Sequence, residues 1–327
     1  MKLTLLVKIT LALTFFVILM GAYTRLADAG LGCPDWPGCY GKVFVPSSPQ
    51  AIAKAELAFP ERPVEAGKAW LEMIHRYVAS SLGLLIILIC IQAWRQKEAP
   101  KKLPILILVL VLFQGALGMW TVTLKLMPIV VMAHLLGGFS IFSLLYLLYL
   151  RLKPLRIPGG DYGVRPLKGL AMACLAVLVV QISLGGWTSS NYAALACTQL
   201  PICEADWWNN LSPITAFNPI PAGHTHFEFG VLAYAERMTI HVFHRVWALI
   251  TALLLIFFWW RLQHQSRSSA IKRGSQIMLT LLLLQVSLGM ANVVLHIPLA
   301  IAVSHNLVAA LLLLSLIYLN YAIWRKA

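Results

Sequence analysis

The feature that most constrains this chain is a set of eight apolar runs, each close to the ~20 residues that a helix needs to cross ~30 Å of hydrocarbon. Only 12% of the 327 residues are charged and 60% are hydrophobic, too few polar side chains to cover a soluble fold. Lipid satisfies no backbone hydrogen bonds, so the sequence predicts an all-α polytopic membrane protein with eight transmembrane helices. The runs lie near residues 7–27, 70–94, 104–124, 128–150, 168–190, 238–262, 276–295 and 299–323.

The net charge of +14 does not indicate nucleic-acid binding, because the basic residues are spread over separate connecting segments. These segments all fall on one side of an eight-helix path, and by the positive-inside rule that side is cytoplasmic. We therefore expect both termini in the cytoplasm and two long loops, 28–69 and 190–237, on the outer side. The basic segments are 95–102, 151–168, 261–273 and the C-terminal WRKA.

The two outer loops and the helices after them contain an internal repeat. Three pairs of segments align in the same order, at offsets of 164, 169 and 171 residues. The order predicts two homologous four-helix bundles, and an even number of helices gives both copies the same orientation in the membrane. We place them at residues 1–155 and 156–327. The aligned pairs are 21–39 with 185–203, 72–76 (EMIHR) with 241–245 (HVFHR), and 114–134 with 285–305.

Each outer loop carries two cysteines six positions apart, Cys33 with Cys39 and Cys197 with Cys203. Disulfides persist outside the cytoplasm, so we expect a structural disulfide in each loop. Thiols that cycle to exchange electrons are the alternative, which the sequence leaves open.

Four of the nine histidines occupy repeated positions within helices, His75 with His244 and His134 with His305. A single histidine in a helix is most simply explained by a hydrogen bond to a neighbouring helix, but repeated polar groups within a membrane point to function. One imidazole from each of two facing helices can ligate haem iron on both sides, whereas zinc and copper sites need three or four clustered ligands. We therefore expect the four histidines to be axial haem ligands.

The residues around these histidines sharpen the hypothesis. Glu72 lies three positions before His75 and shares its helix face, whereas His241 stands at the equivalent place in the second copy. The difference suggests that the first copy performs chemistry and the second carries electrons. A simple ion pair between Glu72 and Arg76 is the alternative. Arg76 and Arg245 follow a ligand directly and suit either haem propionates or lipid headgroups.

Small residues near the predicted ligands give the bundle room for a large planar group. Gly137 and Gly138 follow His134 by one turn, and Gly83 lies two turns after His75. Ordinary close packing of helices explains Gly83 equally well.

The chain resembles the haem A synthase family over nearly its whole length. The resemblance lies in the order of the EMIHR and HVFHR motifs, the paired histidines and the cysteine pairs along the chain. The resemblance implies an oxidoreductase of haem biosynthesis in the bacterial cytoplasmic (inner) membrane. It would oxidise the C8 methyl group of haem O to the formyl group of haem A for cytochrome oxidase biogenesis. It also implies that His75 and His134 flank the substrate haem, that His244 and His305 hold a haem b cofactor, and that Glu72 is catalytic.

The expected substrate is therefore haem O, and the expected surroundings are membrane lipid. Candidate protein partners are haem O synthase and cytochrome oxidase assembly factors. The chain could also form homo-oligomers, which the sequence leaves open. The main rival function is a di-haem membrane cytochrome b that only transfers electrons, which explains the histidines but not Glu72. A membrane disulfide oxidoreductase would not need the histidines. A two-repeat transporter would be expected to have broken helices with charged residues at the midplane.

Overall fold

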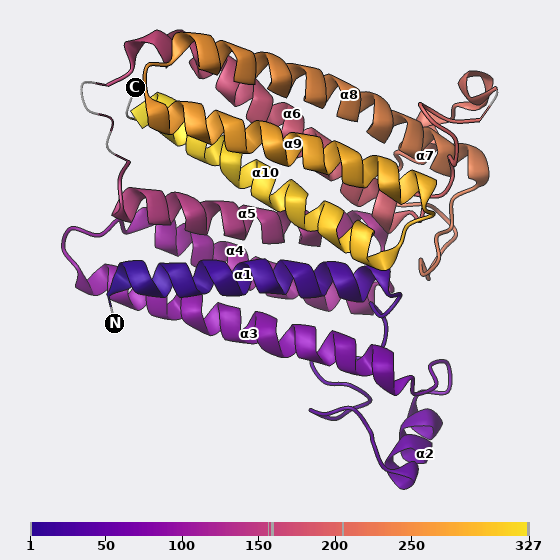
Figure 1. The fold of residues 1–327 in the computed structure, drawn as a ribbon. Helices are drawn as coiled ribbons and strands as arrows, with labels where there is room; N and C mark the ends of the chain where they lie inside the picture. The colour runs from indigo at the N-terminus through magenta and orange to yellow at the C-terminus, as the bar shows by residue number, and fades with distance from the viewer. Residues whose placement is uncertain (1, 156, 158–159, 205, 326–327) are drawn as a thin grey trace. The chain divides into compact units, whose positions relative to one another are not determined.

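The computed structural model describes residues 2–155, 157, 160–204 and 206–325, and within this part of the chain every extended regular element is helical. Eight of the helices are long and apolar enough to cross a membrane, which confirms the predicted fold class (Figure 1). They are α1 (Leu3–Leu26), α3 (Ala66–Arg95), α4 (Lys102–Thr123), α5 (Pro128–Leu152), α6 (Lys168–Ser190), α8 (Tyr234–Gln265), α9 (Ser269–Val294) and α10 (Leu299–Arg325).

Seven of the eight helices extend beyond their apolar run at one end or both, and α6 has the predicted bounds. Helix α3 begins four residues before the expected position 70, and α8 begins four residues before position 238. Their first turns contain polar residues such as Lys68 and Glu236, which an apolar-run criterion excludes. The Glu236 carboxylate accepts a hydrogen bond of 2.6 Å from the Ala233 N–H and so caps the start of α8.

Two compact units make up the chain. Unit 1 comprises Met1–Phe142 with Pro219–Val231, and unit 2 comprises Ser143–Asn218 with Leu232–Ala327. In unit 2, α6 packs against α8, α8 against α9, α9 against α10 and α10 against α6, which closes a four-helix ring. Unit 1 has the equivalent neighbours α1 with α3 and α3 with α4. The predicted boundary between residues 155 and 156 falls at a position outside the described residues, and that division of the chain stays a prediction.

The outer loops are more structured than expected. Both predicted disulfides are present, Cys33–Cys39 and Cys197–Cys203. The first loop also contains α2 (Pro49–Ala58), whose start is capped by the Ser48 hydroxyl accepting from the Ala51 N–H at 3.2 Å. The second loop contains the short helices η2 (Trp207–Asn210) and α7 (Pro213–Ala216).

A segment of the second outer loop, Pro219–Val231, belongs to unit 1, and we call it the strap. The Phe227 N–H donates to the Lys125 carbonyl at 3.0 Å, and the Phe227 side chain is buried. Arg62 donates two hydrogen bonds to the Glu228 carboxylate, at 2.8 and 3.0 Å. This pairing raises the pKa of Arg62 above its ordinary value. The first unit is therefore completed by residues from the second half of the sequence.

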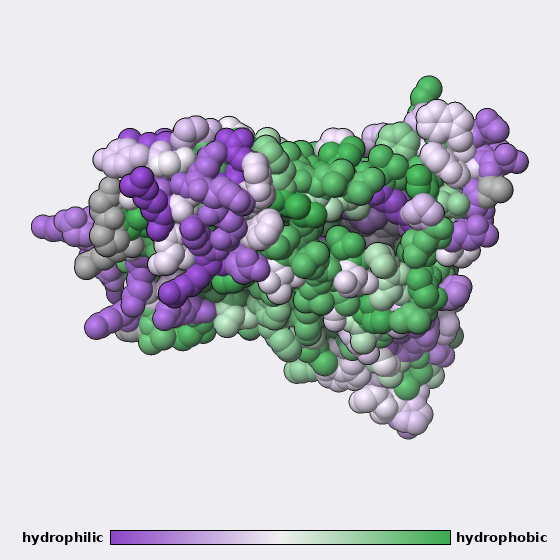
Figure 2. Space-filling model, turned by 45° about the horizontal axis from the view of Figure 1, so that its top comes forward, coloured by the Kyte–Doolittle hydropathy of each residue, from purple (hydrophilic) through white to green (hydrophobic). Residues whose placement is uncertain are grey.

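The surface follows the composition. Hydrophobic residues cover the middle of the helices on the face shown in Figure 2, and hydrophilic residues gather toward the ends. Large apolar side chains such as Leu112, Leu249 and Leu253 are at least 60% exposed, as expected for groups that face lipid. The chain is a multi-pass membrane protein.

Candidate functional site

The two repeated histidines of unit 1 each pack against a glycine of a preceding transmembrane helix. His75 on α3 lies against Gly21 of α1, where an added Cβ would stand 3.0 Å from the His75 Cε1 atom. His134 on α5 lies against Gly118 of α4, with the corresponding distance 3.3 Å. A side chain at either glycine would displace the imidazole, so the glycines allow the rings to rest against helix backbone.

The two repeated histidines of unit 2 have the same arrangement. His244 on α8 lies against Gly185 of α6, and His305 on α10 lies against Gly289 of α9, each with an added Cβ 3.2 Å from Cε1. The repeat therefore preserves four histidine–glycine contacts as well as four histidines.

The four histidines lie in the halves of their helices that are nearer to the outer loops and hairpins. His134 and His305 are each six residues after the start of their helix, about 9 Å along its axis. His75 and His244 are nine and ten residues after theirs, about 14 and 15 Å. The apolar run that starts near residue 70 would place His75 only five residues into its helix, and the earlier start of α3 at Ala66 accounts for the difference.

The chemistry of this donor set fits haem. Within each unit the two imidazoles are close enough to interact electrostatically, His75 with His134 and His244 with His305. The Nδ1 atoms of His75, His134 and His305 are buried and have no hydrogen-bond partner among the described residues, a costly state for imidazoles without a ligand. Two neutral imidazoles in apolar surroundings are the donor set that a low-spin haem iron takes.

Glutamine side chains contact three of the histidines. In unit 2, the Gln181 amide nitrogen lies 3.1 Å from His244 Nδ1, and the Gln285 amide nitrogen lies 3.1 Å from His305 Nε2. In unit 1, Gln114, the repeat equivalent of Gln285, donates instead to the backbone carbonyl of His134 at 2.6 Å. The repeat aligns two of these glutamines, Gln114 with Gln285, and that alignment is the sequence signal that could have found them.

The arginine of unit 1 that follows a histidine binds the first disulfide loop, residues 33–39. Arg76 donates to the backbone carbonyls of Asp35, Pro37 and Gly38, at 3.1 Å for Asp35 and 3.2 Å for Pro37. It also donates to the carboxylate of Glu72. These bonds hold the loop against α3.

Unit 2 repeats this connection. Arg245 donates to the carbonyls of Gln199, Ile202 and Cys197 in the second disulfide loop, residues 197–203, at 2.5 to 2.6 Å. Two of these carbonyls, at 199 and 202, are the repeat equivalents of positions 35 and 38. Arg76 and Arg245, the two residues predicted to contact haem propionates, thus each bind a disulfide loop in this structure. Their contact with propionates stays a prediction.

Glu72 and His241 mark the difference between the units. Glu72 is 5% exposed, and its second carboxylate oxygen accepts from the Cys33 N–H at 2.9 Å while Arg76 binds the first. His241 is equally buried, and its Nε2 atom accepts from the Arg245 Nε at 3.1 Å. Unit 1 therefore contains a buried carboxylate beside its histidines where unit 2 contains an imidazole.

The glycines expected to make room for a macrocycle have other neighbours. A Cβ on Gly137 would stand 2.1 Å from the Gln114 side-chain oxygen, and one on Gly138 would stand 3.6 Å from its nitrogen. A Cβ on Gly83 would meet nothing within 4 Å. The glycines that do contact the histidines were already paired by the repeat, Gly21 with Gly185 and Gly118 with Gly289, and that pairing was the signal that could have found them.

The second disulfide loop places Cys197, Cys203 and Glu204 close together, but the two sulfurs are bonded to each other and are not thiolate ligands for a metal. Partial burial tends to raise the pKa of Glu204. Hydrogen bonds of 2.7 Å from the N–H and the hydroxyl of Thr198 outweigh it and lower that pKa below the ordinary value. Glu204 thus closes the loop as an ionised acceptor.

Comparison with known proteins extends over nearly the whole chain. Residues 4–317 match the family described as cytochrome oxidase assembly protein. A protein of Shewanella oneidensis named heme A synthase is 59% identical over all of this chain and 98% of its own length. Proteins with the same name from Rhizorhabdus wittichii and Halalkalibacterium halodurans are 28% and 26% identical, over 95% and 93% of this chain and 91% of each relative.

Proposed function

The chain belongs to the cytochrome oxidase assembly protein family, and from that membership we propose that it acts as a haem A synthase. In this role it is an oxidoreductase of haem A synthesis. It converts the C8 methyl group of haem O to the formyl group of haem A, which cytochrome oxidase requires. The observation that carries the proposal is the paired histidine geometry found in both units, combined with a buried carboxylate in only one.

In this proposal the two units bind different haems. His75 and His134 flank haem O as substrate in unit 1, and His244 and His305 hold haem b in unit 2. The glycine contacts fix each imidazole against a helix backbone, which supports a role as preorganised ligands. Haem b, when bound, supplies a centre that can exchange single electrons. The contact of Gln181 with His244 Nδ1 leaves the Nε2 atom of His244 free for iron and orients the ring, which supports the assignment of the resident cofactor to unit 2.

Glu72 is the catalytic residue of this proposal. Its carboxylate is held on one side by Arg76 and on the other by the Cys33 N–H, so its orientation is fixed without a rearrangement. A negative group in a site of low dielectric stabilises positive charge that develops nearby, and it can accept a proton as an oxygen nucleophile attacks. The first disulfide loop, bound to both Arg76 and Glu72, keeps this carboxylate out of bulk water.

The site also has a proposed setting. We place the protein in the bacterial cytoplasmic membrane with both termini in the cytoplasm, because the basic segments lie at the opposite helix ends from the disulfide loops. Haem O synthase and cytochrome oxidase assembly factors are the proposed partners for delivery of substrate and removal of product. Homo-oligomers are compatible with the large apolar surface.

The test is conversion of haem O in membranes that contain haem O synthase but no other haem A synthase. Haem extracted from such membranes and separated by chromatography should contain haem A when this chain is expressed and only haem O when it is absent. The matched control is the His75→Ala, His134→Ala chain expressed to the same level. A chain that binds haem b but forms no haem A would instead be an electron carrier, a di-haem cytochrome b, and the proposal would be wrong.

A further inference from the structure

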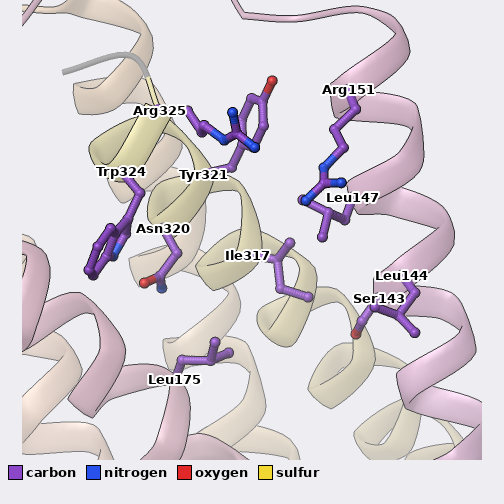
Figure 3. Close-up of a pocket in the computed structure, with 10 residues that line it drawn as sticks. All are labelled: Ser143, Leu144, Leu147, Arg151, Leu175, Ile317, Asn320, Tyr321, Trp324 and Arg325. Atoms are coloured by element: carbon purple, nitrogen blue, oxygen red, sulfur yellow. The ribbon is translucent and has the colours of Figure 1, made fainter. Parts of the chain in front are cut away.

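A groove opens in unit 2 at the ends of the helices farthest from the disulfide loops. It has a cavity volume of about 280 Å³ and is formed by the last turns of α5 and α10 together with α6 (Figure 3). The Tyr321 hydroxyl donates to the Leu150 carbonyl at 3.1 Å and so ties α10 to α5 beside it. None of the histidines or disulfide loops described above contributes to this groove.

The mouth of the groove is cationic. Arg151 lies in the last turn of α5 and Arg325 ends α10, and in Figure 3 the two guanidinium groups extend toward the space between these helices. Both side chains are exposed, and no acidic residue is among the groove's lining. Lys168 adds a third cation, with its ammonium 5.1 Å from the centre of the Trp324 ring. A ligand at this mouth should therefore carry negative charge.

The wall below the mouth is apolar and includes Leu144, Leu147, Leu175 and Ile317. It leads from the basic end of the helices toward their hydrophobic middle, which suits a hydrocarbon chain that lies along the protein. The ligand should therefore combine an anionic head with an apolar tail.

Two buried polar atoms on this wall lack partners. Among the described residues, the Ser143 hydroxyl has no hydrogen-bond partner, and Asn320, 7% exposed, uses its nitrogen on the Ala171 and Leu316 carbonyls but leaves its oxygen unpaired. Unpaired buried polar atoms are costly in apolar surroundings, so the described residues alone do not satisfy this wall.

We propose that this groove binds one anionic phospholipid of the surrounding bilayer. Its phosphate lies between Arg151 and Arg325, and one acyl chain lies along the leucine wall. Basic pockets between transmembrane helices recognise anionic head groups by this combination of charge and apolar contact. Trp324 lies at the same level, where an amphipathic ring is stable at the membrane interface. The proposal does not depend on the haem chemistry of the other sites.

The first experiment measures lipid retained by the purified full-length chain. After exchange into detergent, the chain is titrated with phosphatidylglycerol or phosphatidylcholine, and bound lipid is counted by native mass spectrometry. We expect one phosphatidylglycerol bound in preference to phosphatidylcholine, with affinity falling about fivefold for each of Arg151→Gln and Arg325→Gln. Equal retention of the two lipids would overturn the proposal.

Matched variants separate the groove from net charge and from folding. Arg267→Gln removes the same charge from an exposed position that does not line the groove, and it should bind phosphatidylglycerol as the unaltered chain does. The charge-conserving Arg151→Lys, Arg325→Lys chain should retain most of the binding. A loss with Arg267→Gln as large as with the groove variants would mean that general charge attraction, not this site, binds the lipid.

Trp324 provides an independent readout in a bilayer. The chain is placed in nanodiscs that contain a minor fraction of brominated lipid, which quenches tryptophan fluorescence. The fluorescence of Trp324 is the difference between the unaltered chain and the Trp324→Phe chain. Brominated phosphatidylglycerol should quench this signal more strongly than the same fraction of brominated phosphatidylcholine, and the difference should disappear in the Arg151→Gln, Arg325→Gln chain. Equal quenching by both lipids would show that Trp324 meets only bulk bilayer, which contradicts the proposal.

Discussion

In unit 1 the buried carboxylate of Glu72 receives hydrogen bonds from Arg76 and the Cys33 backbone, whereas in unit 2 the buried imidazole of His241 receives one from Arg245. The surroundings are otherwise shared: paired histidines rest on glycines, and an arginine holds a disulfide loop by equivalent carbonyls. Burial of a carboxylate is costly unless it is paired. The two units therefore share one scaffold, and the buried side chain beside the disulfide loop is a carboxylate in one unit and an imidazole in the other.

The largest expected effect comes from removal of the ligands, because it tests which unit holds which haem. His244→Ala or His305→Ala should abolish the b-type absorption band of the purified protein. His75→Ala should leave that band in place and prevent binding of haem O. Difference spectra and haem extraction measure both results. If the band disappears equally after changes in either unit, the division between the units is wrong.

Glu72→Gln tests the charged position itself. The amide keeps the size of the side chain, and its single oxygen can accept from either Cys33 or Arg76, but it supplies no negative charge and its nitrogen accepts no hydrogen bond. Haem A formation should fall by about 100-fold or more, as for loss of a general base, while the b-type band is unchanged. His241→Gln in the other unit should reduce turnover less. Near-normal haem A formation by Glu72→Gln would leave the carboxylate as a structural partner of Arg76.

The glycine contacts predict a smaller effect that should be specific to each unit. In Gly185→Ala the new methyl group would stand 3.2 Å from His244, so the ring must move, at a cost of about 1–3 kcal/mol in stability and with a shift of the b-type band. The control on the same helix, Gly169→Ala, meets nothing within 4 Å and should be neutral or stabilise by up to about 1 kcal/mol.

The same change in the first unit, Gly21→Ala, should destabilise the protein and leave the b-type band where it is, because its contact is with His75. Thermal unfolding followed by absorption spectroscopy checks all three variants. A shifted band in Gly21→Ala would mean that the two sites are not independent.

The smallest effect concerns the order in which the disulfides are reduced. Cys33, Cys39 and Cys197 are fully buried, whereas Cys203 is partly exposed. Without reductant, alkylation followed by mass spectrometry should label none of the four. With a mild reductant, the second pair should be labelled before the first, because a thiolate reaches an exposed sulfur more readily. Labelling of both pairs at one rate would remove this difference between the loops.

The sequence predicted those parts of the molecule that the membrane or the repeat imposes. Lipid requires long apolar helices, so the sequence located all eight. The predicted helices were too short where polar residues such as Lys68 extend a helix beyond the hydrocarbon. The cysteine pairs of the two long loops predicted both disulfides, and the repeat found the four histidines. It could not find the carbonyls that Arg76 and Arg245 bind, since a backbone acceptor leaves no mark on residue type. The start of α2 was not predicted, although Ser48 followed by Pro49 is a common beginning of a helix and could have indicated it.

The sequence did not predict that the strap packs with unit 1, and the reason is different. A repeat aligns only what both copies share, and the contact of Arg62 with Glu228 has no counterpart in the aligned segments. Opposite charges 166 residues apart give no local signal that they will meet.

That separation has a consequence for the order of synthesis. When α1, α3, α4 and α5 have left the ribosome, Glu228 has not yet been made, so Arg62 and the Lys125 carbonyl lack these partners while α6 is being synthesised. The unit made first is therefore completed late, after most of the second long loop has been synthesised. A chain interrupted before residue 219 contains every residue that we assign to the substrate site and still lacks the segment that completes the fold around it.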